Sequence, residues 1–375
     1  MQNPTRRDVL RTVPAAALLG ASNGFAMPST QRVFIASNTP DGIRAFDWNP
    51  ATAELTSAGV AAVVDNVDWI CLSPDRRAIF AAAEVDSFNG KPTGEVTSLS
   101  DEHGKLTQVS AHNSAAKGTC HCAIDHTGQT LLSADYGGGS AATFKVTNGS
   151  LSPAAWTQHY TQHGPDKDRQ EAAHAHFASF SPDNRFAYIN DLGGDCIHIY
   201  RLNAATAHLT PAGEWRSEPG FGPRTLHFHP NGVTAYCMNE MASTVSVLHW
   251  DKANGSFTTV SQFELHPDPA KGPNTGCDTV ITRDGRFAYF ANRGDDFILS
   301  SKLDPHTGAL TAIGKTPSGG KTPRNFTLDP TERWMLVANQ NSNQVSVFAR
   351  DPHTGTLADQ GKNFDCPTPM CILFA

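Results

Sequence analysis

The sequence predicts an all-β fold, a seven-bladed β-propeller with four-stranded antiparallel blades and a ring closed by strands from both termini. Three observations predict it. Polar turns recur about every fifty residues, apolar strand-like runs flank each turn, and the chain beyond its leader accommodates seven units of about that length. Four antiparallel strands in each repeat of roughly 40 to 50 residues are typical of a propeller blade, whereas a β-sandwich has no such period.

The repeated turns contain residues suited to hairpin loops. Their first residues are Ser73, Asp125, Ser181, His229, Thr282 and Asp329. Successive turns begin 52, 56, 48, 53 and 47 residues apart. Pro, Asp, Asn and Gly within them supply the backbone angles that a tight turn requires. These turns therefore predict six complete blades.

The strands are recognised from the runs around each turn. Residues 286–292 and 334–339 are rich in aromatic and β-branched side chains, and residues 344–348 follow as a third strand. A fourth strand is expected at Leu310 and at Leu357, because each comes just after an Asp-Pro-His-Thr-Gly turn. The repeat thus contains four strands.

The seventh blade is predicted to combine the two ends of the chain. Residues 32–38 resemble the second strand of a blade whose innermost strand is missing, and residues 369–374 supply that strand. Pairing strands from both termini closes the ring and removes exposed sheet edges. The propeller domain is therefore expected to span residues 27–375.

The N-terminal segment, residues 1–26, is typical of an export signal. Arg6 and Arg7 precede an apolar stretch at residues 13–21, and small residues within 24–26 suit a signal peptidase. The arginine pair followed by Asp-Val-Leu resembles a twin-arginine signal, which exports proteins that have already folded. An ordinary secretory signal is the alternative. Either signal predicts a periplasmic or secreted protein.

The composition indicates a globular chain with no nucleic-acid or membrane partner after signal removal. A formal net charge of −7 and the lack of any Lys/Arg block disfavour polyanion binding. Beyond the leader, no apolar run approaches the roughly 20 residues needed to span a bilayer.

The spacing of the eight cysteines resembles no small disulfide scaffold. On a strand, His121 points away from Cys120 and Cys122, which disfavours a metal site. The sequence leaves disulfide pairing and oligomeric state open.

Two positions of the repeat are occupied by polar residues in successive blades. The start of one strand and the end of the next lie at the same edge of an antiparallel sheet, so these residues are expected to meet at one mouth of the channel. Four or five residues before the turns stand Asp68, His121, His176, Arg224, Asp278 and Arg324. Ten or eleven residues after the first residue of each turn stand Glu84, Asp135, Asp191, Glu240, Arg293 and Gln340.

Turn capping is the simpler explanation for some of these residues. Asn292, Asn339, Asp135 and Asp191 have side chains suited to bond nearby backbone groups. Capping does not explain the arginines that begin strands. A shared polar site is therefore predicted at this mouth.

Several motifs in this chain resemble those of a known family. They include His174-Ala175-His176, Asp191-Leu192-Gly193-Gly194-Asp195, Gly222-Pro223-Arg224, Asn239-Glu240, Asn292-Arg293-Gly294 and Pro323-Arg324. Their ordered series resembles the lactonase family of seven-bladed propellers, which includes bacterial 6-phosphogluconolactonases and fungal carboxy-cis,cis-muconate lactonizing enzymes. The resemblance covers nearly the whole mature chain. It implies site residues at His176, Arg224, Glu240 and Arg293. Thr225 departs from the pattern, because the family often has His after that arginine.

Lactone hydrolysis requires a base for water, donors for the oxyanion and a proton source for the leaving alkoxide. We expect His176 to be the general base, with Arg224 and Arg293 binding a substrate carboxylate or phosphate and stabilising the oxyanion. Glu240 is expected to orient His176 or to deliver a proton. The expected further substrate contacts are His121, Asp278, Arg324 and Gln340. No cofactor or metal is expected, and the partner is a small lactone or sugar acid.

Other functions remain open at this point. The same base and arginines suit a muconate-type lactonizing cyclase or isomerase that acts on an unsaturated dicarboxylate. The arginines are alternatively paired with Glu240 and Asp278 in a purely structural network. A non-catalytic scaffold that binds glycan or protein through its rim is a third alternative, with Trp69 and Phe221 beside the mouth. For an exported enzyme, an unphosphorylated lactone is at least as suitable as the cytoplasmic 6-phosphogluconolactone.

Overall fold

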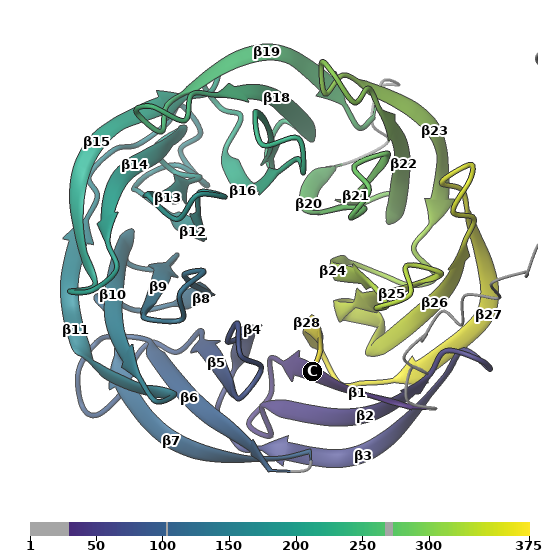
Figure 1. Cartoon of the computed structure of the whole chain (residues 1–375), viewed down its shortest axis with the longest axis horizontal. Coiled ribbons are helices and arrows are strands. Elements are labelled where there is room, and N and C mark those ends of the chain that lie inside the picture. Colours follow the sequence, from purple (N-terminus) through teal and green to yellow (C-terminus); the bar gives the residue numbers. More distant parts are fainter. Residues whose placement is uncertain (1–29, 103, 267–272) are drawn as a thin grey trace, which may run out of the picture.

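The computed structural model describes residues 30–102, 104–266 and 273–375. It shows seven four-stranded antiparallel sheets arranged in a ring around a central axis (Figure 1). The predicted seven-bladed propeller is confirmed. The predicted export signal, residues 1–26, lies outside the described residues. No helix in the described part of the chain is long and apolar enough to cross a membrane.

The strands of each blade follow one another from the channel outward. The closing blade contains β28 (Pro369–Phe374), β1 (Gln31–Ser37), β2 (Ile43–Asn49) and β3 (Glu54–Ala62). The next contains β4 (Val67–Leu72), β5 (Ala78–Ala83), β6 (Glu95–Glu102) and β7 (Lys105–Asn113). The third contains β8 (Thr119–Ile124), β9 (Thr130–Asp135), β10 (Ser140–Thr147) and β11 (Ser150–His159). The fourth contains β12 (Ala175–Phe180), β13 (Phe186–Asp191), β14 (Cys196–Asn203) and β15 (His208–Arg216).

The remaining three blades repeat this order. The fifth contains β16 (Pro223–Phe228), β17 (Thr234–Asn239), β18 (Thr244–Trp250) and β19 (Phe257–Glu264). The sixth contains β20 (Thr275–Ile281), β21 (Phe287–Arg293), β22 (Phe297–Leu303) and β23 (Leu310–Pro317). The seventh contains β24 (Pro323–Leu328), β25 (Trp334–Asn339), the short 3₁₀ helix η1 (Gln340–Ser342), β26 (Gln344–Arg350) and β27 (Leu357–Asp365).

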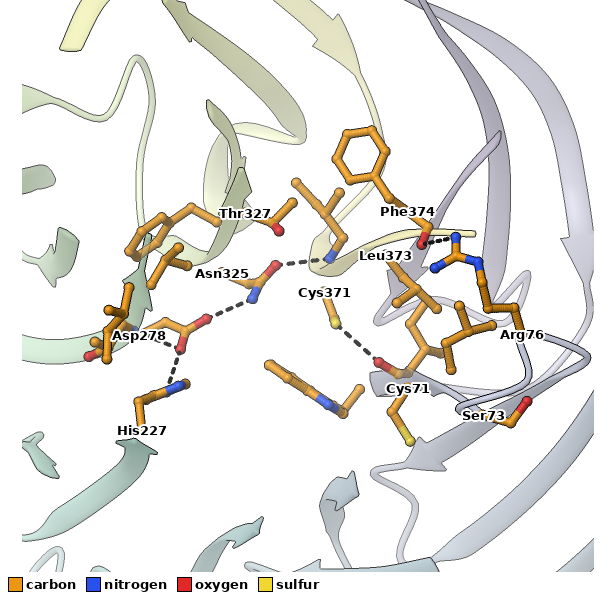
Figure 2. Close-up of a pocket in the computed structure, with 18 of the residues that line it drawn as sticks. Cys71, Ser73, Arg76, His227, Asp278, Asn325, Thr327, Cys371, Leu373 and Phe374 are labelled. Atoms are coloured by element: carbon orange, nitrogen blue, oxygen red, sulfur yellow. Dashed lines mark hydrogen bonds and ion pairs between the residues drawn. The ribbon is translucent and has the colours of Figure 1, made fainter. Parts of the chain in front are cut away.

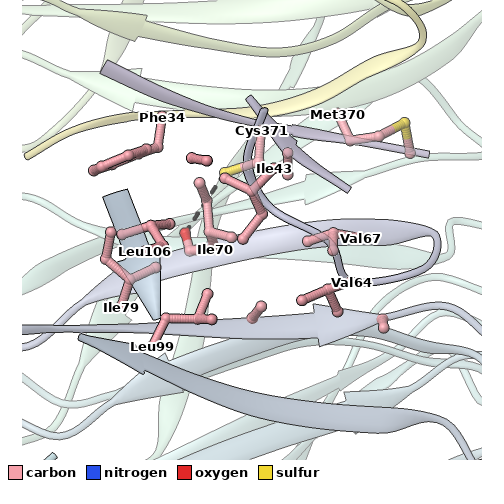
Figure 3. Close-up of a cluster of buried hydrophobic side chains, with 14 of the residues drawn as sticks. Phe34, Ile43, Val64, Val67, Ile70, Ile79, Leu99, Leu106, Met370 and Cys371 are labelled. Carbon is pink, nitrogen blue, oxygen red and sulfur yellow. Dashed lines mark hydrogen bonds between the residues drawn. The ribbon is translucent and has the colours of Figure 1, made fainter. Parts of the chain in front are cut away.

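The C-terminal strand closes the ring as expected. β28 pairs antiparallel with β1, so that Cys371 lies opposite Ala36. In the cluster at this seam, Met370 and Cys371 pack with Ile70 of the neighbouring blade (Figure 3). Burying one such apolar side chain contributes about 1.5 to 3 kcal/mol, which offsets the entropy of ordering the last strand. All eight cysteines have free thiols.

Each innermost strand contains a pairing irregularity near its start. In β12, Ala175 pairs with Asp191 and Phe177 pairs with Asn190, so His176 between them has no partner in the ladder. A bulge of this kind re-aims the side chain of the extra residue. Equivalent residues in the seven blades are Asp68, Cys120, His176, Arg224, Cys277, Arg324 and Met370, here called the bulge ring. All seven line a constriction of the channel of about 20 Å³.

A second set of residues lies beside the bulge ring. The backbone N–H of Glu84 donates to Asn66 O, and that of Glu240 donates to Gly222 O, both at 2.8 Å. The residue whose carbonyl accepts this hydrogen bond comes two positions before the bulge residue of the same blade. The hydrogen bond therefore holds the residue that follows the second strand next to the bulge residue. The set comprises Asn38, Glu84, Tyr136, Leu192, Glu240, Arg293 and Gln340, here called the strand-end ring.

Asp135 and Asp191 belong to neither ring. Each is the last residue of its second strand, one position before the strand-end ring. Asp135 accepts a hydrogen bond from Thr119 Oγ1 at 2.7 Å, and Asp191 accepts one from the backbone N–H of His174 at 2.8 Å. Their side chains therefore stabilise the blade ends, as the capping interpretation predicts.

Candidate active site

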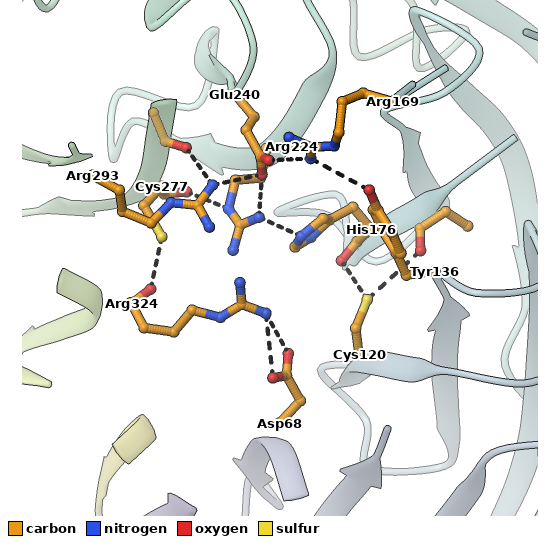
Figure 4. A network of polar contacts seen from close by, with 12 residues as sticks. Asp68, Cys120, Tyr136, Arg169, His176, Arg224, Glu240, Cys277, Arg293 and Arg324 are labelled. Carbon is orange, nitrogen blue, oxygen red and sulfur yellow. Dashed lines mark hydrogen bonds and ion pairs between the residues drawn. The ribbon is translucent and has the colours of Figure 1, made fainter. Parts of the chain in front are cut away.

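Four predicted residues meet in one cavity at the mouth of the channel where the strand-end ring lies. The cavity has a volume of about 200 Å³. Its lining comprises Glu84, Cys120, Tyr136, Arg169, His176, Arg224, Glu240, Arg293 and Arg324. His176, Arg224, Glu240 and Arg293 come from three consecutive blades, so the fold brings together side chains that are far apart in sequence (Figure 4).

Glu240 is the acceptor at the centre of this cluster. Its Oε2 accepts from Arg224 Nη1 and lies 2.9 Å from Arg293 Nη2, while its Oε1 lies 2.6 Å from Arg169 Nη2. Burial alone would raise the pKa of Glu240, but the charges of Arg293 and Arg224 lower that pKa well below its usual value. Glu240 is therefore ionised at neutral pH. Glu240 can therefore hold the guanidinium groups in position, but it has no proton to deliver.

His176 is buried against Arg224. Its Nε2 accepts a hydrogen bond from Arg224 Nη1, and because a guanidinium only donates, Nε2 carries no proton. Its Nδ1 is buried without a hydrogen-bond partner in the described part of the chain. Burial and then the charge of Arg224 lower the pKa of His176 well below its usual value. The imidazole is consequently neutral at neutral pH, which is the state that a general base requires.

Arg324 faces Arg224 across the cavity (Figure 4). Arg324 Nη2 lies 3.0 Å from Asp68 Oδ2, and Arg224 Nε donates to Cys277 O at 2.8 Å. Within the described chain, no hydrogen bond is found for Arg224 Nη2 or Arg324 Nη1. Two guanidinium groups that face each other across open space repel unless an anion lies between them. This gap therefore suits a substrate anion or a developing oxyanion.

Of the four predicted substrate contacts, Arg324 alone lines this cavity. His121 and Asp278 stand four residues before their turns, whereas the cavity residues of the bulge ring stand five before. They lie at the constriction instead. Gln340 occupies the strand-end ring but begins η1 and is not part of the cavity lining.

The surroundings of His121 are those of a packed aromatic side chain. Its ring centroid lies 4.4 Å from that of Trp69 and 4.0 Å from that of Phe177. Its Nδ1 accepts the backbone N–H of Ala178 at 3.2 Å. Burial lowers the pKa of His121 well below its usual value, so the ring is neutral at neutral pH.

Asp278 belongs to the opposite side of the constriction. It lines a wider cavity of about 760 Å³ at the other mouth of the channel (Figure 2). There its Oδ2 accepts from Asn325 Nδ2 at 2.7 Å, and its Oδ1 lies 3.6 Å from His227 Nε2. Of the ion pairs considered for Arg224 and Arg293, those with Glu240 are present, whereas Asp278 pairs with Asn325 and His227.

Sequence reasoning missed two residues of the cavity, Arg169 and Tyr136, and named two others, Glu84 and Cys120, without assigning them a role. Arg169 lies between β11 and β12, outside the repeated positions, so no spacing signal indicates it. Tyr136 comes eleven residues after Asp125, and counting eleven in every blade would have found it. The sequence analysis included Glu84 among the polar residues at strand ends but gave it no role in the site. Arg169 Nη2 also contacts Tyr136 Oη at 3.4 Å.

A metal ion would meet strong repulsion in this cavity, because four arginines line it. Among the described residues, one group of three side chains has metal-ligating atoms within 4.8 Å of one another, at Asp191, Cys196 and His198. None of the three lines the cavity. Burial raises the pKa of the Cys196 thiol, so the thiol is protonated at neutral pH.

The fold and the cavity together define a propeller with a small polar cavity on its axis. The comparisons identify the family. The model of the family described as "Lactonase, 7-bladed beta-propeller" matches residues 32–374 of this chain. The chain therefore belongs to this family.

Two relatives and one solved structure illustrate the similarity. A Bacillus subtilis protein named 6-phosphogluconolactonase is 29% identical over 335 residues, 89% of this chain and 94% of the relative. A protein of the same name from Formosa agariphila is 30% identical over 323 residues, 84% of this chain and 90% of the relative. The structure of the Pseudomonas aeruginosa periplasmic gluconolactonase PpgL superposes with a TM-score of 0.87 at 28% identity, covering 92% of this chain and 99% of that one.

Proposed function

We propose that this protein hydrolyses a lactone in the axial cavity and releases the open-chain hydroxy acid. The convergence of His176, Arg224, Glu240 and Arg293 in one cavity is the observation that carries the proposal. The names of the relatives support it, since they are 6-phosphogluconolactonases and a gluconolactonase.

The size and charge of the cavity favour a small, polar substrate. A volume of about 200 Å³ suits an occupant the size of a single small ring. Four arginines face the carboxylates of Glu240 and Asp68, so the lining is net positive. A sugar lactone, with or without an anionic substituent, suits this lining.

His176 is the general base of the proposed reaction. Its unprotonated Nε2 accepts a proton from the attacking water after the contact with Arg224 opens. Arg224 and Arg293 then donate to the oxyanion that forms at the carbonyl, and Arg324 completes the positive wall. Glu240 holds Arg224 and Arg293 in place.

Replacement of His176 by Ala tests this function. Hydrolysis of D-glucono-1,5-lactone and of its 6-phosphate is followed in a pH-stat, with spontaneous hydrolysis subtracted. Loss of a positioned base should reduce kcat by at least about 100-fold. His208→Ala, an exposed histidine on β15, is the matched control and should retain wild-type turnover. Wild-type turnover in His176→Ala would remove His176 from the mechanism.

Measurements with other substrates and ligands separate the alternative functions. Conversion of an unsaturated dicarboxylate without hydrolysis of any lactone would favour the lactonizing direction. Binding of a glycan or protein with no turnover in either direction would favour a scaffold.

Export of the mature protein is part of the proposal. The arginine pair and apolar stretch of residues 1–26 support it, as does the structural similarity to a periplasmic gluconolactonase. An exported location favours an unphosphorylated lactone as the natural substrate.

A further inference from the structure

The proposed reaction lacks a proton donor for the leaving oxygen. Opening of the ring expels an alkoxide, which is a poor leaving group unless a proton reaches it. Glu240 is unsuitable, because Arg293, Arg224 and Arg169 keep it ionised. His176 is neutral before the reaction and acts first as the base. A separate acid would be another group that lines the cavity.

Glu84 lies in the same cavity at a position equivalent to that of Glu240. It follows β5 directly, and its backbone N–H donates to Asn66 O at 2.8 Å, as that of Glu240 does to Gly222 O. Both residues belong to the strand-end ring. The blade of Glu84 lies three places from the blade of Glu240 in a ring of seven, so the two carboxyl groups approach the cavity from nearly opposite sides.

The surroundings of Glu84 are the reverse of those of Glu240. Among the described residues, no hydrogen bond or ion pair to its carboxyl group is found, whereas Glu240 contacts three arginines. Burial, and then the negative charge of Asp68, raise the pKa of Glu84 to about 7. Arg324 and Arg224 partly offset this rise, and Asp86 adds to it.

Two carboxyl groups with opposite pKa shifts in one cavity point to different roles in proton transfer. The other groups lining the cavity do not alter this contrast: Cys120 has its pKa raised well above the usual value by burial, and the pKa of Tyr136 is raised by burial as well. Both remain protonated at neutral pH but are far weaker acids than a carboxyl group of pKa about 7. Glu84 is the cavity group that both holds a proton near neutral pH and readily releases it.

We propose that Glu84 is the general acid that protonates the ring oxygen of the lactone as the ring opens. This inference rests on the proposed lactonase function. Water attacks the carbonyl carbon, its oxygen forms the new C–O bond, and one of its protons moves to His176 Nε2. The bond between the carbonyl carbon and the ring oxygen then breaks, its electron pair stays on the ring oxygen, and the proton of Glu84 moves to that oxygen.

The cycle closes without any further reagent. After ring opening, His176 carries one additional proton and Glu84 lacks one. A proton passes from His176 to Glu84 through water in the cavity once the hydroxy acid leaves. The net reaction is the addition of one water to one lactone.

Glu84→Gln is the decisive variant, because Gln keeps the size of the side chain but has no acidic proton. Glu95→Gln is the matched control: Glu95 is also a buried carboxyl group with a raised pKa, but it bonds Thr97 outside the cavity. kcat for the lactone that the wild type turns over best is measured across the pH range, with spontaneous hydrolysis subtracted. Melting curves by circular dichroism report the fold.

The acid role predicts a loss in kcat of about 100-fold or more for Glu84→Gln. Wild-type kcat should also fall as pH rises through the pKa of Glu84, and this fall should be missing from the residual activity of the variant. Glu95→Gln should behave like the wild type in both respects. A merely structural role for Glu84 would not remove the pH dependence.

Each result has a separate meaning. If the wild type turns over no lactone, the proposed function fails. If the wild type is active and Glu84→Gln keeps its kcat or its alkaline decline, the acid role alone is overturned. Should Glu84→Gln fail to fold, Glu84→Asp takes its place, because the shorter side chain keeps the acidic group but withdraws it from the ring oxygen. Wild-type kcat in Glu84→Asp would then overturn the role.

Discussion

Glu84→Gln should change the pH dependence of folding stability as well as that of catalysis. The pKa of Glu84 is about 7 in the folded protein against an ordinary value of 4.5. Because the folded pKa is raised, the folded state disfavours the charged form. The resulting destabilisation is absent below the ordinary value, grows as pH rises from there, and is complete above about pH 7. At about 1.4 kcal/mol per pKa unit, this shift corresponds to roughly 3 kcal/mol.

Gln cannot ionise, so the variant should escape this destabilisation. The free energy of unfolding is measured by urea titration for both proteins at about pH 4.5 and about pH 8. The difference between variant and wild type should rise by roughly 3 kcal/mol between these two values, in favour of the variant. With an unfolding entropy of about 2.1 cal/mol/K per residue, this is roughly 4 °C in melting temperature. A difference that stays constant with pH would refute the inference that partial burial and the charge of Asp68 raise the pKa of Glu84.

Three other predictions concern ion pairing, metal dependence and export. Glu240→Gln leaves the buried guanidinium groups without their shared partner, so the free energy of unfolding, measured in urea, should fall by about 3 kcal/mol or more. The control is Glu214→Gln, which removes an exposed ion pair with Arg216 and should lower the free energy of unfolding by less than about 1 kcal/mol. Activity should be unchanged after dialysis against EDTA, because the arginine-lined cavity disfavours cations; a loss that added metal restores would contradict this. Substitution of Arg6 and Arg7 by Lys should retain the precursor in the cytoplasm, as judged by cell fractionation, and unaltered export would indicate an ordinary secretory signal.

Most of the fold could be predicted from the sequence because the repeat is local. Each turn contains Pro, Asp, Asn or Gly at fixed places, and the strands around it are short and apolar. The closing blade was predictable for a different reason, since residues 32–38 lack an inner partner and residues 369–374 lack a following strand. Pairing the two was the one arrangement that left neither edge exposed.

The site was predicted less completely, and the bulges explain why. A bulge shifts the register by one residue, which moves a side chain from one face of the strand to the other. His176 and Arg224 stand five residues before their turns and reach the cavity, whereas His121 and Asp278 stand four before and do not. The count separates the two classes, but only the bulge in the structure shows which of the two leads into the cavity. Arg169 could not be predicted from the repeat, because it lies in the segment between β11 and β12, outside the repeated positions.

The charge of the cavity favours the transition state over the bound lactone. The four arginines of the cavity outnumber the carboxylates of Glu240 and Asp68, so the cavity carries uncompensated positive charge before a substrate binds. A neutral lactone carbonyl relieves little of this repulsion, whereas the oxyanion adds a full negative charge among the guanidinium groups. Interactions that strengthen only as charge develops accelerate the chemical step. The charges of Arg324 and Arg224 also favour ionisation of Glu84, but burial and the charge of Asp68 outweigh them and raise its pKa to about 7. The protonated fraction of Glu84 leaves the positive charge of the arginines available for the oxyanion.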